Sequence, residues 1–142
     1  MLFKKHKINE EKVELVKVSA LLIHAAKIDE DFSKEEELII RQYLLKIGAN
    51  KTDIEDIIIK AKKIEENSNQ ILDFTKEIKN MNDNDKIKII KTLWKIIFSN
   101  KEADIYETNL MRRLAGLLYI DSKIMGDIKE QIKKEISNDL HS

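Results

Sequence analysis

The chain has 142 residues, with 26 basic and 26 acidic side chains, 3 glycines, no proline and no cysteine. The lack of cysteine excludes a disulfide framework, a thiolate nucleophile and thiolate-ligated metal clusters. A net charge of zero argues against a global attraction to nucleic acid. The chain contains no run of 18 apolar residues, so we expect no membrane-spanning helix. No apolar run follows the basic start, so we expect no signal peptide. We therefore expect a single-domain cytoplasmic protein. Peripheral contact between the basic start, Lys4–Lys7, and an anionic surface stays open.

Apolar residues recur with helical spacing along the chain, and strand-like alternation is nowhere sustained. The pattern predicts helices over about 10–28, 33–48, 52–65, 71–80, 85–99, 104–118 and 122–136. We expect an all-α, single-domain bundle of about seven helices over residues 10–136, between a basic tail at 1–9 and a polar tail at 137–142. The first and fifth helices are apolar nearly all round, which is typical of helices at the centre of a bundle.

Several helix ends carry recognisable signals. Ser33 with Glu36 is a capping-box pattern, in which a hydroxyl and a carboxylate each bind an otherwise unpaired backbone N–H group. Thr52 with Glu55 predicts a second capping box, and Gly48 predicts a left-handed stop to the second helix. The polar run 82–85 is suited to capping the fifth helix.

The two halves of the sequence share one arrangement when they are aligned with an offset of 71 residues. Leu22 then falls on Leu93, Ser33 on Asp104, and Arg41 on Arg112. Few positions are identical, so the repeat is weak. It predicts two helical half-units whose apolar first helices pack together, with acidic loops in equivalent places.

These acidic loops are the main candidates for chemistry. Oxygen-bearing side chains occupy positions 1, 3, 5 and 8 of both loops: Asp29, Asp31, Ser33 and Glu36 in the first, and Asn100, Glu102, Asp104 and Glu107 in the second. Hard oxygen ligands suit Ca²⁺, Mg²⁺ or Mn²⁺. An EF-hand is excluded because Lys34 and Ile40 stand where that loop needs glycine and glutamate. The alternative is that these acids only stabilise helix N-termini through the helix dipole, without any ion.

Other features favour structural roles. His24 has apolar neighbours and no second histidine at ligand spacing, and Trp94 lies on an apolar helix, so we expect both to pack in or near the core. A basic strip of lysines and arginines is more typical of a solvated helix face than of an anion-binding surface; its members are Lys86, Lys88, Lys91, Lys95, Arg112 and Arg113. No nucleophile and base can be paired, so we expect no enzyme activity.

Two segments resemble the motifs of the tellurite-resistance TerB-like family. The run 21–36, LLIHAAKIDEDFSKEE, is similar to the family's apolar helix followed by Asp-Gly-Glu and a later glutamate. The run 100–118 is similar to its second motif, Asp-Gly-Glu…Tyr-Glu leading into Arg-Leu-Ala-x-Leu-Leu. Glu30 and Lys101 stand where the motifs have glycine, and Asn100 stands where the second motif has aspartate. The similarity spans about residues 13–134.

The resemblance implies an all-helical bundle without known catalytic activity that binds a divalent metal in responses to tellurite and other chemical stress. The residues that match the family's acidic motifs are Asp29, Asp31, Glu36, Glu102, Asp104 and Glu107. The alternative function is a ligand-free module that docks a partner helix, as TerB-like regions of co-chaperones are thought to do. The docking surface would be a groove beside the central helices or a face bearing Tyr43, Tyr106 and Tyr119.

Overall fold

Seven helices form the described part of the chain in a computed structural model. The structure describes residues 2–27, 32–68, 70–99 and 105–141, without the side chains of 2–11, 105–107 and 139–141. The helices are α1 Leu2–Ala26, α2 Lys34–Lys46, α3 Lys51–Glu66, α4 Leu72–Ile78, α5 Asp83–Ser99, α6 Ile105–Leu117 and α7 Ser122–His141. The described part of the chain contains no strand. The prediction of an all-α bundle of about seven helices is confirmed.

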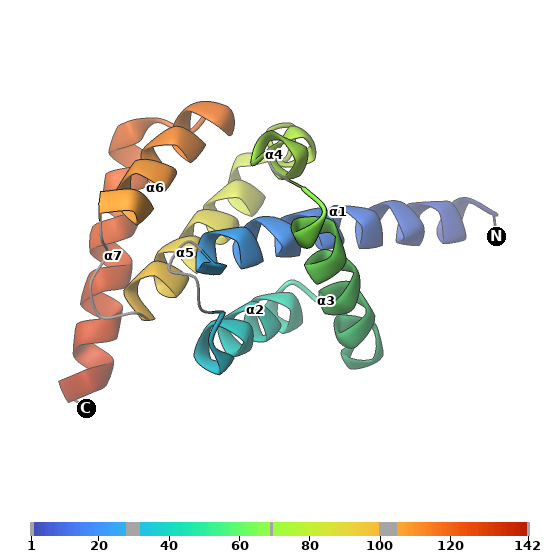
Figure 1. Cartoon of the computed structure of the whole chain (residues 1–142), viewed down its shortest axis with the longest axis horizontal. Helices are drawn as coiled ribbons and strands as arrows, with labels where there is room; N and C mark the ends of the chain where they lie inside the picture. The colour runs from blue at the N-terminus through green and yellow to red at the C-terminus, as the bar shows by residue number, and fades with distance from the viewer. Residues whose placement is uncertain (1, 28–31, 69, 100–104, 142) are drawn as a thin grey trace.

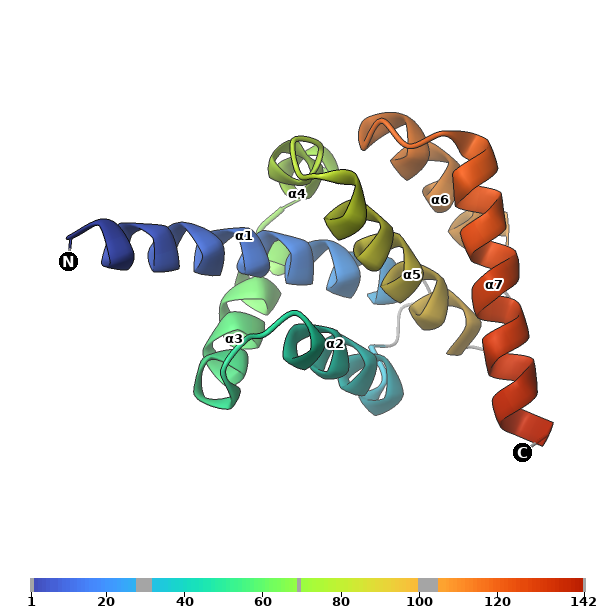
Figure 2. The ribbon, with the colours of Figure 1, turned by 180° about the vertical axis from the view of Figure 1, so that it is seen from behind.

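The C-terminal half of α1 lies at the centre of the molecule (Figure 1). From Val18 to Ile23 every side chain of α1 is buried, because α2, α3, α4 and α5 all pack against it. Helix α5 is the second central element and lies between α1 and α7 when the ribbon is seen from behind (Figure 2). Its apolar side chains are buried over most of its length, as the pattern of the sequence predicts.

The weak repeat corresponds to real structural units. Helices α2 and α6 begin and end 71 positions apart, and the starts of α3 and α7 differ by the same 71. Helix α3 packs on α1 as α7 packs on α5, and α1 packs on α5. With the same offset, α4 and α5 together fall on the residues of α1, and α4 itself packs on α1.

The helix ends follow the predicted signals with one exception. Ser33 caps α2 in a complete capping box with Glu36, and Gly48 has φ +94° just after the C-cap Ile47. Asn82 Oδ1 accepts the N–H of Asp85 at 2.8 Å at the start of α5.

The prediction of a capping box at Thr52 and Glu55 is wrong. Helix α3 begins at Lys51 with Asn50 as its N-cap, so Thr52 lies inside the first turn. The carboxylate of Glu55 pairs instead with the guanidinium of Arg41 on α2.

Two helices also run further than predicted. Helix α1 begins at Leu2 rather than near residue 10, and α7 continues to His141 rather than ending near residue 136. No glycine or proline interrupts either extension, so a helix that tertiary packing has nucleated can propagate through them. None of the described helices has a stretch that is both long and apolar enough to cross a membrane.

Candidate functional site

The structure describes few of the predicted metal ligands. Asp29, Asp31, Glu102 and Asp104 lie outside the described residues, and so does the side chain of Glu107 in the first turn of α6. Among the side chains that are described, no three histidine, aspartate or glutamate residues gather into a metal-binding group.

Glu36 is the one predicted ligand whose side chain is described. Its Oε1 accepts the backbone N–H of Ser33 at 2.8 Å, and its own N–H donates to Ser33 Oγ at 3.1 Å. The residue is completely buried in the first turn of α2, where the helix dipole favours negative charge. The capping role expected for Glu36 is confirmed, and it uses one carboxylate oxygen.

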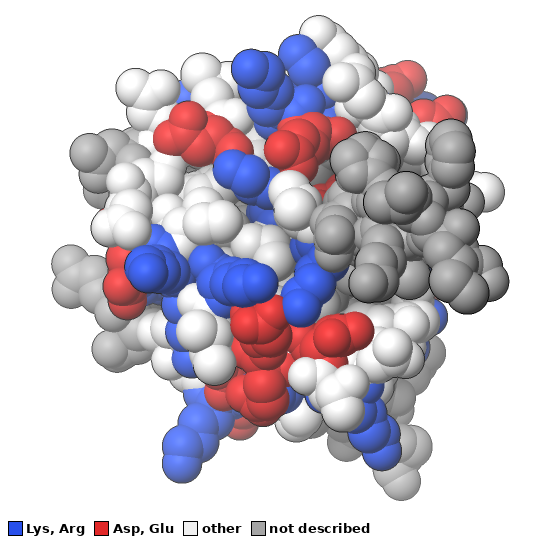
Figure 3. Space-filling view, turned by 90° about the vertical axis from the view of Figure 1, so that its right-hand side faces the viewer, with Lys and Arg blue, Asp and Glu red and all other residues white. Residues whose placement is uncertain are grey.

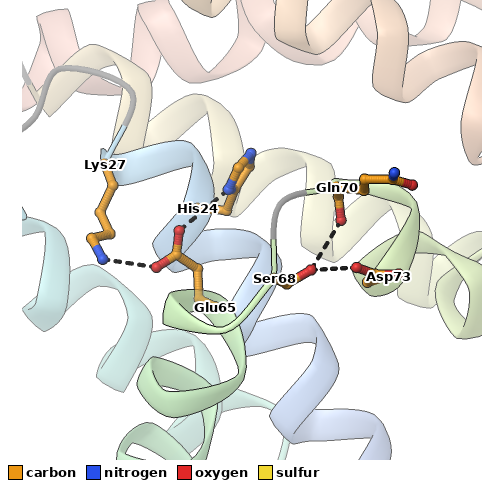
Figure 4. Close-up of polar contacts among 6 residues, drawn as sticks. All are labelled: His24, Lys27, Glu65, Ser68, Gln70 and Asp73. Atoms are coloured by element: carbon orange, nitrogen blue, oxygen red, sulfur yellow. Dashed lines mark hydrogen bonds and ion pairs between the residues drawn. The ribbon is translucent and has the colours of Figure 1, made fainter.

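A partly buried polar cluster lies where α1 ends (Figure 4). The carboxylate of Glu65, on α3, is 91% shielded from solvent, and its Oε2 lies 2.8 Å from Lys27 Nζ. Its Oε1 lies 3.3 Å from Nδ1 of His24, whose ring also packs against Phe74. His24 is thus a residue at the core boundary, as expected, and the cluster fixes the end of α1 against α3.

An open apolar groove of about 370 Å³ lies between α1 and α3. Val13, Val16 and Ile64 provide its apolar lining, and Val13 keeps 53% of its surface exposed. The other lining residues are all lysines: Lys12, Lys17, Lys60 and Lys63. Figure 3 shows this side of the molecule, with basic side chains across the middle of the view, acidic side chains directly below them, and a mixture of uncharged and charged surface above.

The groove continues toward α4. Lys17, Lys63 and Ile64 also line a neighbouring hollow, whose far side includes Leu72, which is 48% exposed. Together the two hollows form a trough along α1, α3 and α4. We call the α1/α3 part the lysine-rimmed groove.

Ion pairs fix one end of the lysine-rimmed groove. Lys12 Nζ lies 2.6 Å from Asp56 Oδ2, and Lys60 Nζ lies 3.1 Å from the same oxygen. The hydrogen bond from Lys12, followed by that from Lys60, lowers the pKa of Asp56 below its ordinary value. These contacts hold the N-terminal part of α1 against α3.

The tyrosines do not form one docking face. Tyr43 is only 8% exposed, whereas Tyr119, after α6, is 74% exposed. Burial, and then the nearby carboxylates of Asp85 and Glu14, raise the pKa of Tyr43. The side chain of Tyr106 lies outside the described part of α6.

The residues of the predicted basic strip do not share one environment. Lys86 is buried, and its Nζ donates to the carbonyl of Leu118 at 2.9 Å, so it has a structural role. Lys88, Lys91 and Lys95 instead line a hollow between α5 and α2. Trp94 is buried, as expected, and stacks on Phe98 with 5.6 Å between ring centroids.

Two features of these surfaces were not predicted from the sequence. Glu65 pairs with residues 38 and 41 positions away, so no local pattern pointed to it. The lysine-rimmed groove depends on which face of α1 meets α3. The spacing of Lys60, Ile64 and Lys63 along one side of α3 was its only signal in the sequence.

Comparison with known families adds one match. The family model described as "Tellurite resistance protein TerB" matches residues 15–130, most of the chain. The searches of curated proteins and of solved structures returned no match.

Proposed function

Because the chain belongs to the TerB family, we propose that it is a non-enzymatic helical module whose lysine-rimmed groove docks an acidic amphipathic helix of a partner protein. The observation that carries this proposal is an exposed apolar groove with lysines, and no carboxylate, among its described lining residues.

The apolar lining gives the groove its affinity for a helix. Val13 and, further along the trough, Leu72 are about half exposed, so a partner would remove apolar surface from water at both places. Such burial contributes about 25 cal/mol per Å². A helix that presents apolar residues at positions i, i+3, i+4 and i+7 is the usual occupant of such a groove.

The lysine rim gives the groove its preference for acidic partners. Lys17 and Lys63 form no ion pair with any described residue, whereas Lys12 and Lys60 share Asp56. Asp73 and Glu77 line the neighbouring hollow together with these two lysines but form no ion pair with them. The two ammonium groups can therefore pair with carboxylates that flank the apolar face of a partner helix. Complementary charge of this kind speeds association and selects against basic partners.

Two synthetic helices with the same apolar face test the proposal, one flanked by glutamate and one by lysine. We expect fluorescence anisotropy to detect binding of the glutamate-flanked helix alone. Val13→Glu should weaken that binding by at least about tenfold, because it places a charge in the apolar lining. Ile59→Glu is the matched control, since Ile59 is 62% exposed on α3 and is not a lining residue. Equal binding of both helices, or equal effects of both substitutions, would refute the proposal.

A second proposal is that the acidic loops bind a divalent cation in a response to chemical stress. It is supported by a fully buried carboxylate, that of Glu36, directly after the loop that carries Asp29 and Asp31. Carboxylate oxygens suit Ca²⁺, Mg²⁺ or Mn²⁺, and the residues that would supply them are Asp29, Asp31, Glu36, Glu102, Asp104 and Glu107.

Calorimetric titration of chelator-treated protein with each cation tests this second proposal. We expect heat of binding that is lost in the double variant Asp31→Asn, Glu102→Gln. The control Asp127→Asn, which changes an exposed carboxylate on α7, should retain it. Absence of both heat and a thermal shift at about 1 mM metal would rule the site out.

A further inference from the structure

A second basic hollow lies between α2 and α5 and has a volume of about 360 Å³. Ile39 and Tyr43 from one side of α2, together with its C-cap Ile47, make part of the wall apolar. Lysines surround these residues: Lys46 from the last turn of α2, and Lys88, Lys91 and Lys95 from one face of α5. We call this feature the α2/α5 hollow.

The positive charge of the α2/α5 hollow is not balanced by described neighbours. None of its four lysines forms an ion pair with a described residue, and no carboxylate is among its lining residues. Acidic groups gather instead in a neighbouring hollow that also touches Tyr43, where Glu14 and Asp85 are lining residues. In a chain with no net charge, this separation leaves four like charges around one cavity, and a bound anion would relieve their repulsion.

The side chains that carry the positive charge indicate which anionic group the hollow would bind. The rim contains lysines and no arginine, so it offers mobile point charges rather than planar forks. Arginine forks suit flat, two-point recognition of a carboxylate, whereas lysine binds phosphate as a point charge and adapts to several oxygens. Several lysines around one cavity therefore favour a group that carries more than one negative charge.

The apolar wall of the hollow indicates that the ligand also has an organic part. An inorganic ion would gain nothing from Ile39, Tyr43 and Ile47, while an organic body would bury apolar surface against them. The volume lies in the range of about 300–1,000 Å³ that is typical of small-molecule sites. The amide of Gln42 adds one polar group that can orient a ligand.

We propose that the α2/α5 hollow binds a small phosphorylated organic molecule, with its phosphates on the lysines and its organic body against the apolar side chains of α2. This site is separate from the lysine-rimmed groove, because the two share no lining residue. The inference does not depend on the docking proposal.

Calorimetry with ATP as the probe tests this inference, with EDTA present so that metal at the acidic loops does not contribute. We expect one ATP per chain, and a dissociation constant that rises by at least about tenfold in the double variant Lys91→Ala, Lys95→Ala. The control Lys133→Ala, Lys134→Ala removes the same charge from exposed positions on α7 and should bind as the unchanged protein does. Adenosine, which lacks the phosphates, and inorganic phosphate, which lacks the organic body, should both bind at least about tenfold more weakly than ATP.

Four outcomes would overturn the inference. They are no ATP heat at about 1 mM ligand, equal weakening in the two double variants, inorganic phosphate as tight as ATP, and ATP binding that the glutamate-flanked helix abolishes. Equal weakening would mean that ATP responds only to the total charge of the protein. Thermal melts followed by circular dichroism confirm that each variant is folded, which is expected because the substituted lysines are not buried.

Discussion

Lys27 Nζ lies 2.8 Å from Oε2 of Glu65, which ties the residue after α1 to the last turns of α3. The pair joins residues 38 positions apart and sits directly before the first acidic loop. His24 contacts the other oxygen of the same carboxylate. Glu65 thus holds the C-terminal end of α1 against the C-terminal end of α3.

Glu65→Ala should lower the free energy of unfolding by about 1–3 kcal/mol, because it removes a charge-assisted hydrogen bond from a shielded site. Glu66→Ala is the matched control, since the neighbouring carboxylate is exposed and its loss should change stability by less than about 0.5 kcal/mol. Urea denaturation measures both. Equal effects of the two substitutions would show that the Glu65 pair does not stabilise the fold.

Lys86→Met should destabilise the second unit. It keeps the apolar stem of a buried side chain but removes the hydrogen bond to Leu118 O, at an expected cost of about 1–3 kcal/mol. Hydrogen exchange should show the largest loss of protection at the turn between α6 and α7. The same change at exposed Lys88 should leave exchange there unaltered, and a matching loss in that variant would argue against a role for the hydrogen bond.

Two glycine substitutions should have opposite signs. Gly48→Ala places a side chain at φ +94° and should cost about 1–2 kcal/mol. Gly126→Ala lies inside α7 with open space around the new methyl group, and should stabilise the protein by about 0.5–1 kcal/mol. Thermal melts measure both changes, and an increase in melting temperature for Gly48→Ala would contradict the left-handed stop.

The Lys12–Asp56 pair should make stability depend on pH. Because the pKa of Asp56 is lowered in the folded state, the pair stabilises the fold above the unfolded value of about 3.9. This contribution is lost as the pH falls through the folded-state pKa. Asp56→Asn should therefore lower the melting temperature at pH 7 but have almost no effect near about pH 2. The control Asp127→Asn should change the melting temperature little at either pH. If Asp56→Asn still melts at a lower temperature than the unchanged protein near about pH 2, the ionised Lys12–Asp56 pair is not the cause of the difference.

Local signals predicted the elements of the fold well. Ser33 is the N-cap of α2 and Glu36 is the third residue of the helix, so their capping box depends on four consecutive residues. Gly48 acts through its own backbone conformation. The apolar surfaces of α1 and α5 required only helical periodicity. The Thr52–Glu55 prediction failed because a tertiary partner, Arg41, takes the carboxylate of Glu55.

The surfaces were harder to predict because they combine residues from different helices. The spacing of Lys88, Lys91 and Lys95 indicates one face of α5, yet nothing in the sequence says that this face borders α2. Tyr43 shows the reverse case. Its spacing from Ile40 and Leu44 already places it on the buried side of α2, so helical geometry excludes it from an exposed tyrosine face.

The most direct test of the docking function is an amide NMR titration with the glutamate-flanked helix. We expect the largest chemical-shift changes at residues 12–17 of α1 and 60–64 of α3, and smaller changes along the trough toward α4. Changes centred on α2 and α5, or on α6 and α7, would contradict it, as would a spectrum that the peptide leaves unchanged at saturating concentration.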